Sequence, residues 1–128
     1  MSWFRRAPDL PPLPEAPKVG DLPEARLESA GRYLGTTTDG EKLTAHGLGG
    51  QGSARIRLSD AALDVVRLGA PLRIPATALR GARHEEDVMV VRWAHGDRVL
   101  ETALRLNGDD TAGWVRRISK LARKHSSG

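Results

Sequence analysis

The stretch NGDDTAGWVRRISKLARKH, residues 107–125, decides the fold because it is the one segment of the chain with helical periodicity. Its apolar residues recur on one stripe of a helix: Trp114, Val115, Ile118, Leu121 and Ala122. Asp109, Asp110 and Thr111 precede that stripe, and such residues cap a helix N-terminus and suit its positive dipole end. The pattern predicts one amphipathic helix over about residues 109–124.

Upstream of this helix, residues 25–106 follow the two-residue period of β-strands. SARIRLSD, residues 53–60, shows it most clearly, with Ala54, Ile56 and Leu58 on one face and arginines on the other. Turn signals separate such runs, for example Asp39-Gly40 and the sequence His-Gly-Asp at 95–97. The segment predicts about seven short antiparallel strands, with residues 70–85 forming a single strand at a sheet edge or bend.

Seven strands followed by one helix that carries a tryptophan are the elements of a pleckstrin-homology-like (PH-like) barrel. This mainly β fold consists of two nearly orthogonal antiparallel sheets that form an open barrel, capped by the C-terminal α-helix. We expect Trp114, Ile118 and Leu121 to plug one end, with Trp114 touching both sheets. The domain then covers residues 25–125, and residues 126–128 form a disordered tail.

The N-terminal segment differs from the rest of the chain in composition. WFRRAPDLPPLPEAP, residues 3–17, belongs to a stretch that holds six of the eight prolines within the first 23 residues. Proline fixes φ and favours extended geometry before it, so residues 1–24 are predicted to form an extended strap. We expect few contacts between this strap and the barrel. Residues 5–11 also fit a polyproline ligand motif, although a spacer is favoured.

Composition excludes several classes of function. A chain of 128 residues without cysteine forms one domain and has no disulfide, thiol nucleophile or cysteine-based zinc site. The four histidines are scattered, so no metal or other cofactor is expected. A net charge of +4 with five aromatic residues disfavours nucleic-acid binding. However, residues 107–128 carry five basic and two acidic groups, the most basic part of the chain.

Three short motifs suggest chemistry, and each is better explained by structure. GLGGQG, residues 47–52, is followed by a strand pattern rather than a helix, which indicates a loop and not a dinucleotide site. HEED, residues 84–87, fits a solvated turn better than a catalytic carboxylate pair. The hairpin at residues 36–43 sets only Lys42 against Asp39 and Glu41, so phosphoinositide binding is not expected. We therefore expect no enzymatic activity.

The motifs GRYLGTTTDG, AHGLG, LDVVRLGAP, IPATALRGAR and WAHGD, in this order before the helix, resemble an actinobacterial family of PH-like proteins. The resemblance covers residues 3 to 124, and members are often labelled export or transporter proteins. It implies an N-terminal transmembrane helix, absent from this sequence, followed by a Trp/Arg-rich junction and a proline strap. Trp3 and Phe4 would then lie at the membrane interface, and Arg5 and Arg6 on its cytoplasmic side. Without that helix, this chain is expected to be soluble and cytoplasmic.

These observations lead to the hypothesis of a non-catalytic interaction module for a protein partner, tethered to the inner membrane face in its full-length form. The strand near residues 72–79 could take a peptide beside the helix. Arg80, Arg83 and His84, in the loop beyond it, are the candidate residues for an acidic partner. The alternative is a regulatory partner of a pyrimidine-biosynthesis enzyme, because the family's genes often lie beside that pathway. A carrier of small molecules is disfavoured, because side chains should fill so small a barrel.

Overall fold

The computed structural model describes residues 10–16, 24–67, 70–108 and 110–126. Within these residues, eight strands and one α-helix follow each other in sequence, with 3₁₀ turns η2 (Ala45–Gly47) and η3 (Ala76–Ala78). The strands are β1 (Leu27–Thr38), β2 (Glu41–Lys42), β3 (Gly52–Leu58), β4 (Ala62–Val66), β5 (Leu72–Pro75), β6 (Leu79–Glu85), β7 (Val88–His95) and β8 (Arg98–Leu106). The helix is α1 (Thr111–Ser126).

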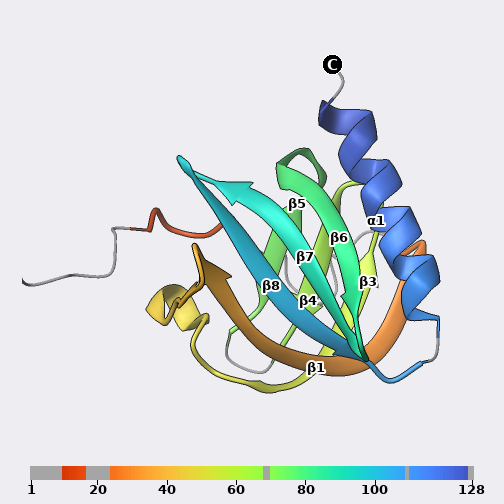
Figure 1. The fold of residues 1–128 in the computed structure, drawn as a ribbon, viewed down its shortest axis with the longest axis horizontal. Coiled ribbons are helices and arrows are strands. Elements are labelled where there is room, and N and C mark those ends of the chain that lie inside the picture. Colours follow the sequence, from red (N-terminus) through yellow and green to blue (C-terminus); the bar gives the residue numbers. More distant parts are fainter. Residues whose placement is uncertain (1–9, 17–23, 68–69, 109, 127–128) are drawn as a thin grey trace, which may run out of the picture.

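The strands form one antiparallel sheet in the order β5-β4-β3-β1-β8-β7-β6, with the two-residue β2 paired to the end of β1. The sheet curls into an open barrel, and α1 packs along one side (Figure 1). The prediction of a mainly β fold with a C-terminal helix is confirmed. The two halves are not separate sheets, because the long β1 pairs with β3 through its first part and with β8 through its second.

Two predicted strands differ from the structure. Residues 70–85 form β5 and β6 with η3 between them, so this segment connects the two edges of the sheet. Pro75, at φ −59° and ψ 145°, ends β5 and cannot donate to a further ladder bond. Of residues 41–48, only β2 is a strand, because Thr44 leaves the extended region and η2 follows. Arg80, Arg83 and His84 therefore lie within β6, not in a loop.

A directed chain of hydrogen bonds crosses the barrel interior. The Tyr33 hydroxyl donates to the Leu48 carbonyl at 2.7 Å, so it can only accept from the Thr36 hydroxyl, 2.6 Å away. Thr36 in turn accepts from Thr102 at 2.9 Å, and Thr102 accepts from the indole Nε1–H of Trp93 at 2.9 Å. Each of the four donors has one acceptor, which buried polar groups require. These hydrogen bonds tie Leu48, within the glycine run at 47–52, to β1, β8 and β7.

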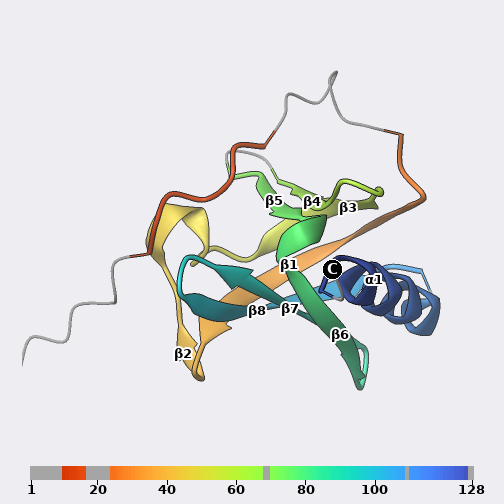
Figure 2. The same ribbon diagram turned by 90° about the horizontal axis from the view of Figure 1, so that it is seen from above.

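The helix buries Trp114, Ile118 and Ala122, whereas Leu121 is only partly buried. Trp114 is 5% exposed and belongs to the single core cluster of the domain. The helix packs mainly on β6, η3 and β7 rather than equally on both halves of the sheet (Figure 2). The apolar stripe of α1 faces β6 and η3, and the expectation that Trp114 touches both sheets as part of a plug stays a prediction. Leu121 lies at the border of that stripe.

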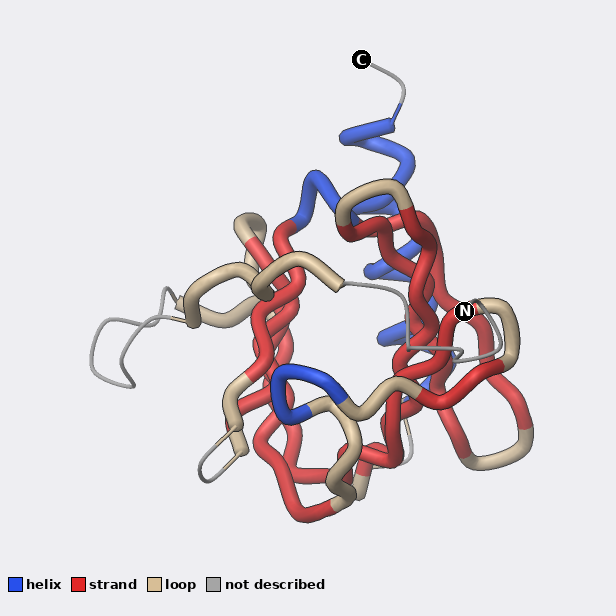
Figure 3. The backbone as a smooth tube through the Cα atoms, turned by 90° about the vertical axis from the view of Figure 1, so that its left-hand side faces the viewer, coloured by secondary structure: helices blue, strands red, loops and turns tan. Residues whose placement is uncertain are grey.

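Residues 10–16 lie at the end of the barrel away from α1, next to η2 (Figure 2), and Figure 3 views the molecule from that side. Leu10 is 8% exposed and is part of the core. Nε2 of His46 donates to the Leu10 carbonyl at 2.9 Å, and Nε2 of His95 donates to the Pro11 carbonyl at 2.8 Å. The segment has no helix or strand, as its prolines predict.

The prediction that this segment makes few contacts is wrong for residues 10–16. An extended proline-rich segment leaves its backbone carbonyls free to accept, and two histidines from distant parts of the chain donate to those of Leu10 and Pro11. A leucine between prolines can also enter a core without any ladder bonds. The predicted membrane-proximal residues Trp3, Phe4, Arg5 and Arg6 lie outside the described residues, as do residues 127 and 128 of the predicted tail, whereas its first residue, Ser126, belongs to α1.

Candidate functional site

The three residues predicted to meet an acidic partner are all exposed on β6, and one is already engaged. Arg83 donates from Nε to Glu85 at 2.7 Å and from its two terminal nitrogens to both carboxylate oxygens of Glu101. The bonds to Glu101 and then to Glu85 raise the pKa of Arg83. Two carboxylates of the same domain therefore compensate its charge, which weakens the case for a role in binding an acidic ligand.

The other two candidates do not form a common site with Arg83. Arg80 donates to the carbonyls of Thr77 and Leu79, both at 3.0 Å, and so holds the turn η3. His84 is exposed near the β6–β7 turn. At the free edge of β6, the Ser119 hydroxyl of α1 lies 3.4 Å from the Ala82 carbonyl, so the helix already covers part of that edge. The peptide edge predicted at residues 72–79 corresponds to β5 and η3, so this contact on β6 does not test it and it stays a prediction.

A better-formed site lies on the other side of the helix, and we call it the α1 groove. Two adjoining hollows share Arg117 and Lys120 and run between α1, the start of β1 and the β3–β4 turn. The larger hollow has a volume of about 760 Å³. The basic lining residues outnumber the acidic ones, Asp60 and Asp110, by three to one: Arg26, Arg116, Arg117, Lys120, Arg123 and Lys124.

The pKa of Asp60 shows that the electrostatic potential of the α1 groove is positive. Its carboxylate accepts a bond of 2.9 Å from Arg26, which lowers the pKa of Asp60, and the charges of Lys124 and Arg117 lower this pKa further. The side chains of Arg26 and Asp60 are 62% and 68% exposed, so this pair contributes little to stability. Within the described part of the chain, no ion pair involves Arg116, Arg117, Lys120 or Lys124.

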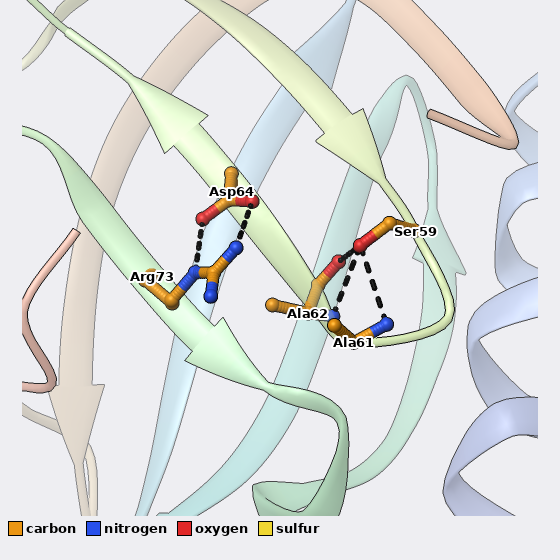
Figure 4. Close-up of polar contacts among 5 residues, drawn as sticks. All are labelled: Ser59, Ala61, Ala62, Asp64 and Arg73. Carbon is orange, nitrogen blue, oxygen red and sulfur yellow. Dashed lines mark hydrogen bonds and ion pairs between the residues drawn. The ribbon is translucent and has the colours of Figure 1, made fainter. Parts of the chain in front are cut away.

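The turn that presents Asp60 is fixed by its own hydrogen bonds (Figure 4). The Ser59 hydroxyl oxygen accepts from the amides of Ala61 and Ala62 at 3.3 and 3.2 Å, and the Ser59 amide donates to the Ala62 carbonyl at 2.9 Å. Behind this turn, Arg73 donates to both oxygens of Asp64 at 2.8 and 3.1 Å and joins β5 to β4. This bond to Asp64 raises the pKa of Arg73. Hydrogen bonds within the domain therefore hold the β3–β4 turn that forms this wall of the groove.

The remaining sequence motifs lie away from the α1 groove. The glycine run at 47–52 leads directly into β3, and Arg67 anchors it by donating to the carbonyls of Gly47 and Gly50 at 2.9 and 3.0 Å. The Arg67 guanidinium also stacks 4.0 Å from the centre of the Tyr33 ring, and burial lowers its pKa. The turn at 84–87 is exposed.

The described segments contain no metal-binding cluster of three or more histidine, cysteine or acidic residues. None of their helices is long and apolar enough to cross a bilayer.

Sequence reasoning did not find the α1 groove, although one signal pointed to it. The basic excess of residues 107–128 was visible, but the helical pattern assigned those side chains only to the outer face of α1. The opposite wall comes from residues about 60 and 90 positions earlier in the chain, and no local pattern places Arg26 and Asp60 beside the helix.

Comparison with protein families agrees with this architecture. A family model described as bacterial PH domain-like matches residues 8–119, which is most of the chain. The match begins before β1 and includes Leu10 and the other described residues of the strap. No curated protein matches the chain in sequence.

Proposed function

Because the chain belongs to the bacterial PH domain-like family, we propose that it is a non-catalytic module that binds a protein partner through the α1 groove. The observation that carries this proposal is the six-to-two excess of basic over acidic side chains along one hollow surface. Four of those cations take part in no ion pair within the described residues. A concave surface whose cations lack acidic neighbours favours a partner that carries negative charge.

Buried side chains fill the barrel interior, which favours a binding site on the outer surface of the barrel. Trp93 and Tyr33 are fully buried at its centre, together with aliphatic side chains from most strands. Their polar atoms are satisfied by the hydrogen-bond chain through Thr102 and Thr36. A carrier of small molecules would need an interior space that these side chains occupy. The β1–β2 turn, with Asp39, Glu41 and a single Lys42, equally disfavours a phosphoinositide site there.

The proposal includes a tether to the inner membrane face through the first residues of the strap. Trp3 to Arg6 have the composition of a membrane interface. Leu10 is fixed to the barrel, and the four-residue step from Arg6 to Leu10 spans at most about 14 Å. Such a tether would hold the domain close to the lipid, with the strap end facing it and α1 away from it. The prolines would then orient the domain instead of spacing it from the membrane.

Site-specific photo-crosslinking in the native cells tests the proposed function. A photo-reactive residue replaces Lys120 in the α1 groove, and Arg55, an exposed side chain on β3, serves as the control position. We expect a protein adduct from position 120 only, and we expect it to disappear when Arg117→Glu and Lys124→Glu are added. The same adducts from both positions, or adducts with lipid alone, would contradict the proposed function.

A further inference from the structure

We propose that the α1 groove recognises an extended acidic segment of the partner, with carboxylates on both sides of one apolar side chain. This inference rests on the proposed function and specifies the chemistry of the partner. Three observations support this inference: the groove favours the ionised form of Asp60, apolar residues line it together with the cations, and it is hollow. Each of these observations favours a peptide over other anionic macromolecules.

Asp60 shows that the α1 groove stabilises an ionised carboxylate. It lies on the wall opposite the helix, and Arg26, Lys124 and Arg117 all favour its ionised form. Four further cations of the groove, Arg116, Arg117, Lys120 and Lys124, take part in no ion pair within the described residues, so further acidic groups would be stabilised along the same surface. Because the Arg26–Asp60 pair is solvent-exposed, a partner carboxylate could replace Asp60 as the acceptor for Arg26 at little cost.

The apolar residues of the α1 groove lie between its cations. Leu121 is partly buried and lines the larger hollow together with Leu58, and Leu27 lines the smaller one. Leu121 is thus a helix residue whose apolar surface is only partly used by the core. A partner side chain placed there would bury apolar area at about 25 cal/mol per Å², which adds selectivity to the electrostatic attraction.

The shape and composition of the groove favour a peptide over a bilayer or a nucleic acid. A flat membrane surface contacts protruding cations, whereas here Asp60 and Asp110 stand among cations that line a hollow. Single-stranded nucleic acids stack on aromatic side chains, and the described lining of the groove contains none. An acidic segment can place its charges around Asp60 and offer an apolar side chain to Leu121.

The test uses the full chain and a fluorescent peptide of about ten residues, rich in glutamate with one central leucine, a length suited to groove binding. Binding is followed by fluorescence anisotropy at low and at physiological salt. Lys120→Glu should weaken binding roughly tenfold, and Arg32→Glu, the same charge change on β1, should have little effect. Asp60→Asn should tighten binding a few-fold, and serine in place of the peptide's leucine should weaken it. Melting temperatures of the variants show that each one is folded.

Several outcomes would overturn the inference. Equal weakening by Lys120→Glu and Arg32→Glu would show that only net charge matters. Tighter binding of phosphatidylserine vesicles or of a single-stranded oligonucleotide, lost in Lys120→Glu, would assign the groove to that ligand. If the crosslinking yields a protein adduct while the acidic peptide does not bind, the proposed function stands and the acidic segment is wrong. If neither occurs, both are wrong.

Discussion

Replacing Thr102 with valine removes one hydroxyl from the buried chain with almost no change in side-chain shape. The indole Nε1–H of Trp93 then loses its acceptor at 2.9 Å, and Thr36 loses the donor to its oxygen. An unsatisfied buried donor costs about 1–3 kcal/mol, and the lost acceptor contact adds less because Thr36 still donates to Tyr33. We therefore expect a loss of about 2 kcal/mol.

Urea denaturation followed by tryptophan fluorescence measures this loss. With a slope of about 1–3 kcal/mol per molar urea, the midpoint should fall by about 1 M. Thr102→Ser keeps the hydroxyl and loses one methyl, at about 1 kcal/mol. In the double variant Thr102→Val with Trp93→Phe, the two losses should be less than additive, because the donor left unpaired is gone. Fully additive losses, or an unchanged midpoint for Thr102→Val, would refute the directed chain.

Three further predictions concern the helix, the strap and the acid range. Trp114→Ala should cost about 3–5 kcal/mol, seen as a strongly lowered melting temperature, whereas Trp3→Ala should leave that temperature unchanged. Leu10→Ala should cost at least about 2 kcal/mol because this side chain fills a core position; an unchanged melting temperature would mean that the strap is not docked. Arg83 lowers the pKa of Glu101, so the stability from this contact is present above pH 4.5 and is lost as the pH falls through the lowered pKa. Glu101→Gln should flatten that part of the stability curve, with a small effect because the pair is largely exposed, and an unaltered curve would show that this pair contributes nothing.

The local patterns of the sequence predict the elements of this fold well. Alternation around Ile56 and the stripe through Trp114 and Ile118 depend only on neighbouring residues, so β3 and α1 can be read directly from the sequence. The break at Pro75 was harder to interpret, because proline suits both a sheet edge and the end of a strand. Pro75 ends a strand because the chain crosses at η3 from one edge of the sheet to the other, and this crossing depends on the whole fold.

Contacts between distant segments could not be predicted in this way. Leu10 lies in a proline-rich run that resembles a solvated spacer, and its docking depends on His46 and His95. Thr36 and Thr102 are ordinary strand residues in the sequence, and only the register of β1 with β8 makes them partners. The α1 groove could not be predicted for the same reason, because its two walls come from segments far apart in the sequence.

The contacts of residues 10–16 indicate that the proline strap does not act as a flexible spacer. As a spacer it would let the domain move freely, whereas docked residues 10–16 make it part of the barrel. Leu10 fills the core at the strap end, and the helix covers the barrel at the other end. Leu10, the first described residue of the strap, therefore has a fixed place in the barrel, away from α1.

The central claim is that the α1 groove is the binding face of this domain, and NMR mapping tests it most directly. The amide resonances of the isotope-labelled chain are followed while the acidic peptide is added. We predict that the largest shift changes occur at Asp60, Arg117 and Lys120, together with their neighbours on α1 and the β3–β4 turn. Largest changes along β6 at residues 80–84, or at the strap and the β7–β8 turn, would contradict the claim and place binding elsewhere.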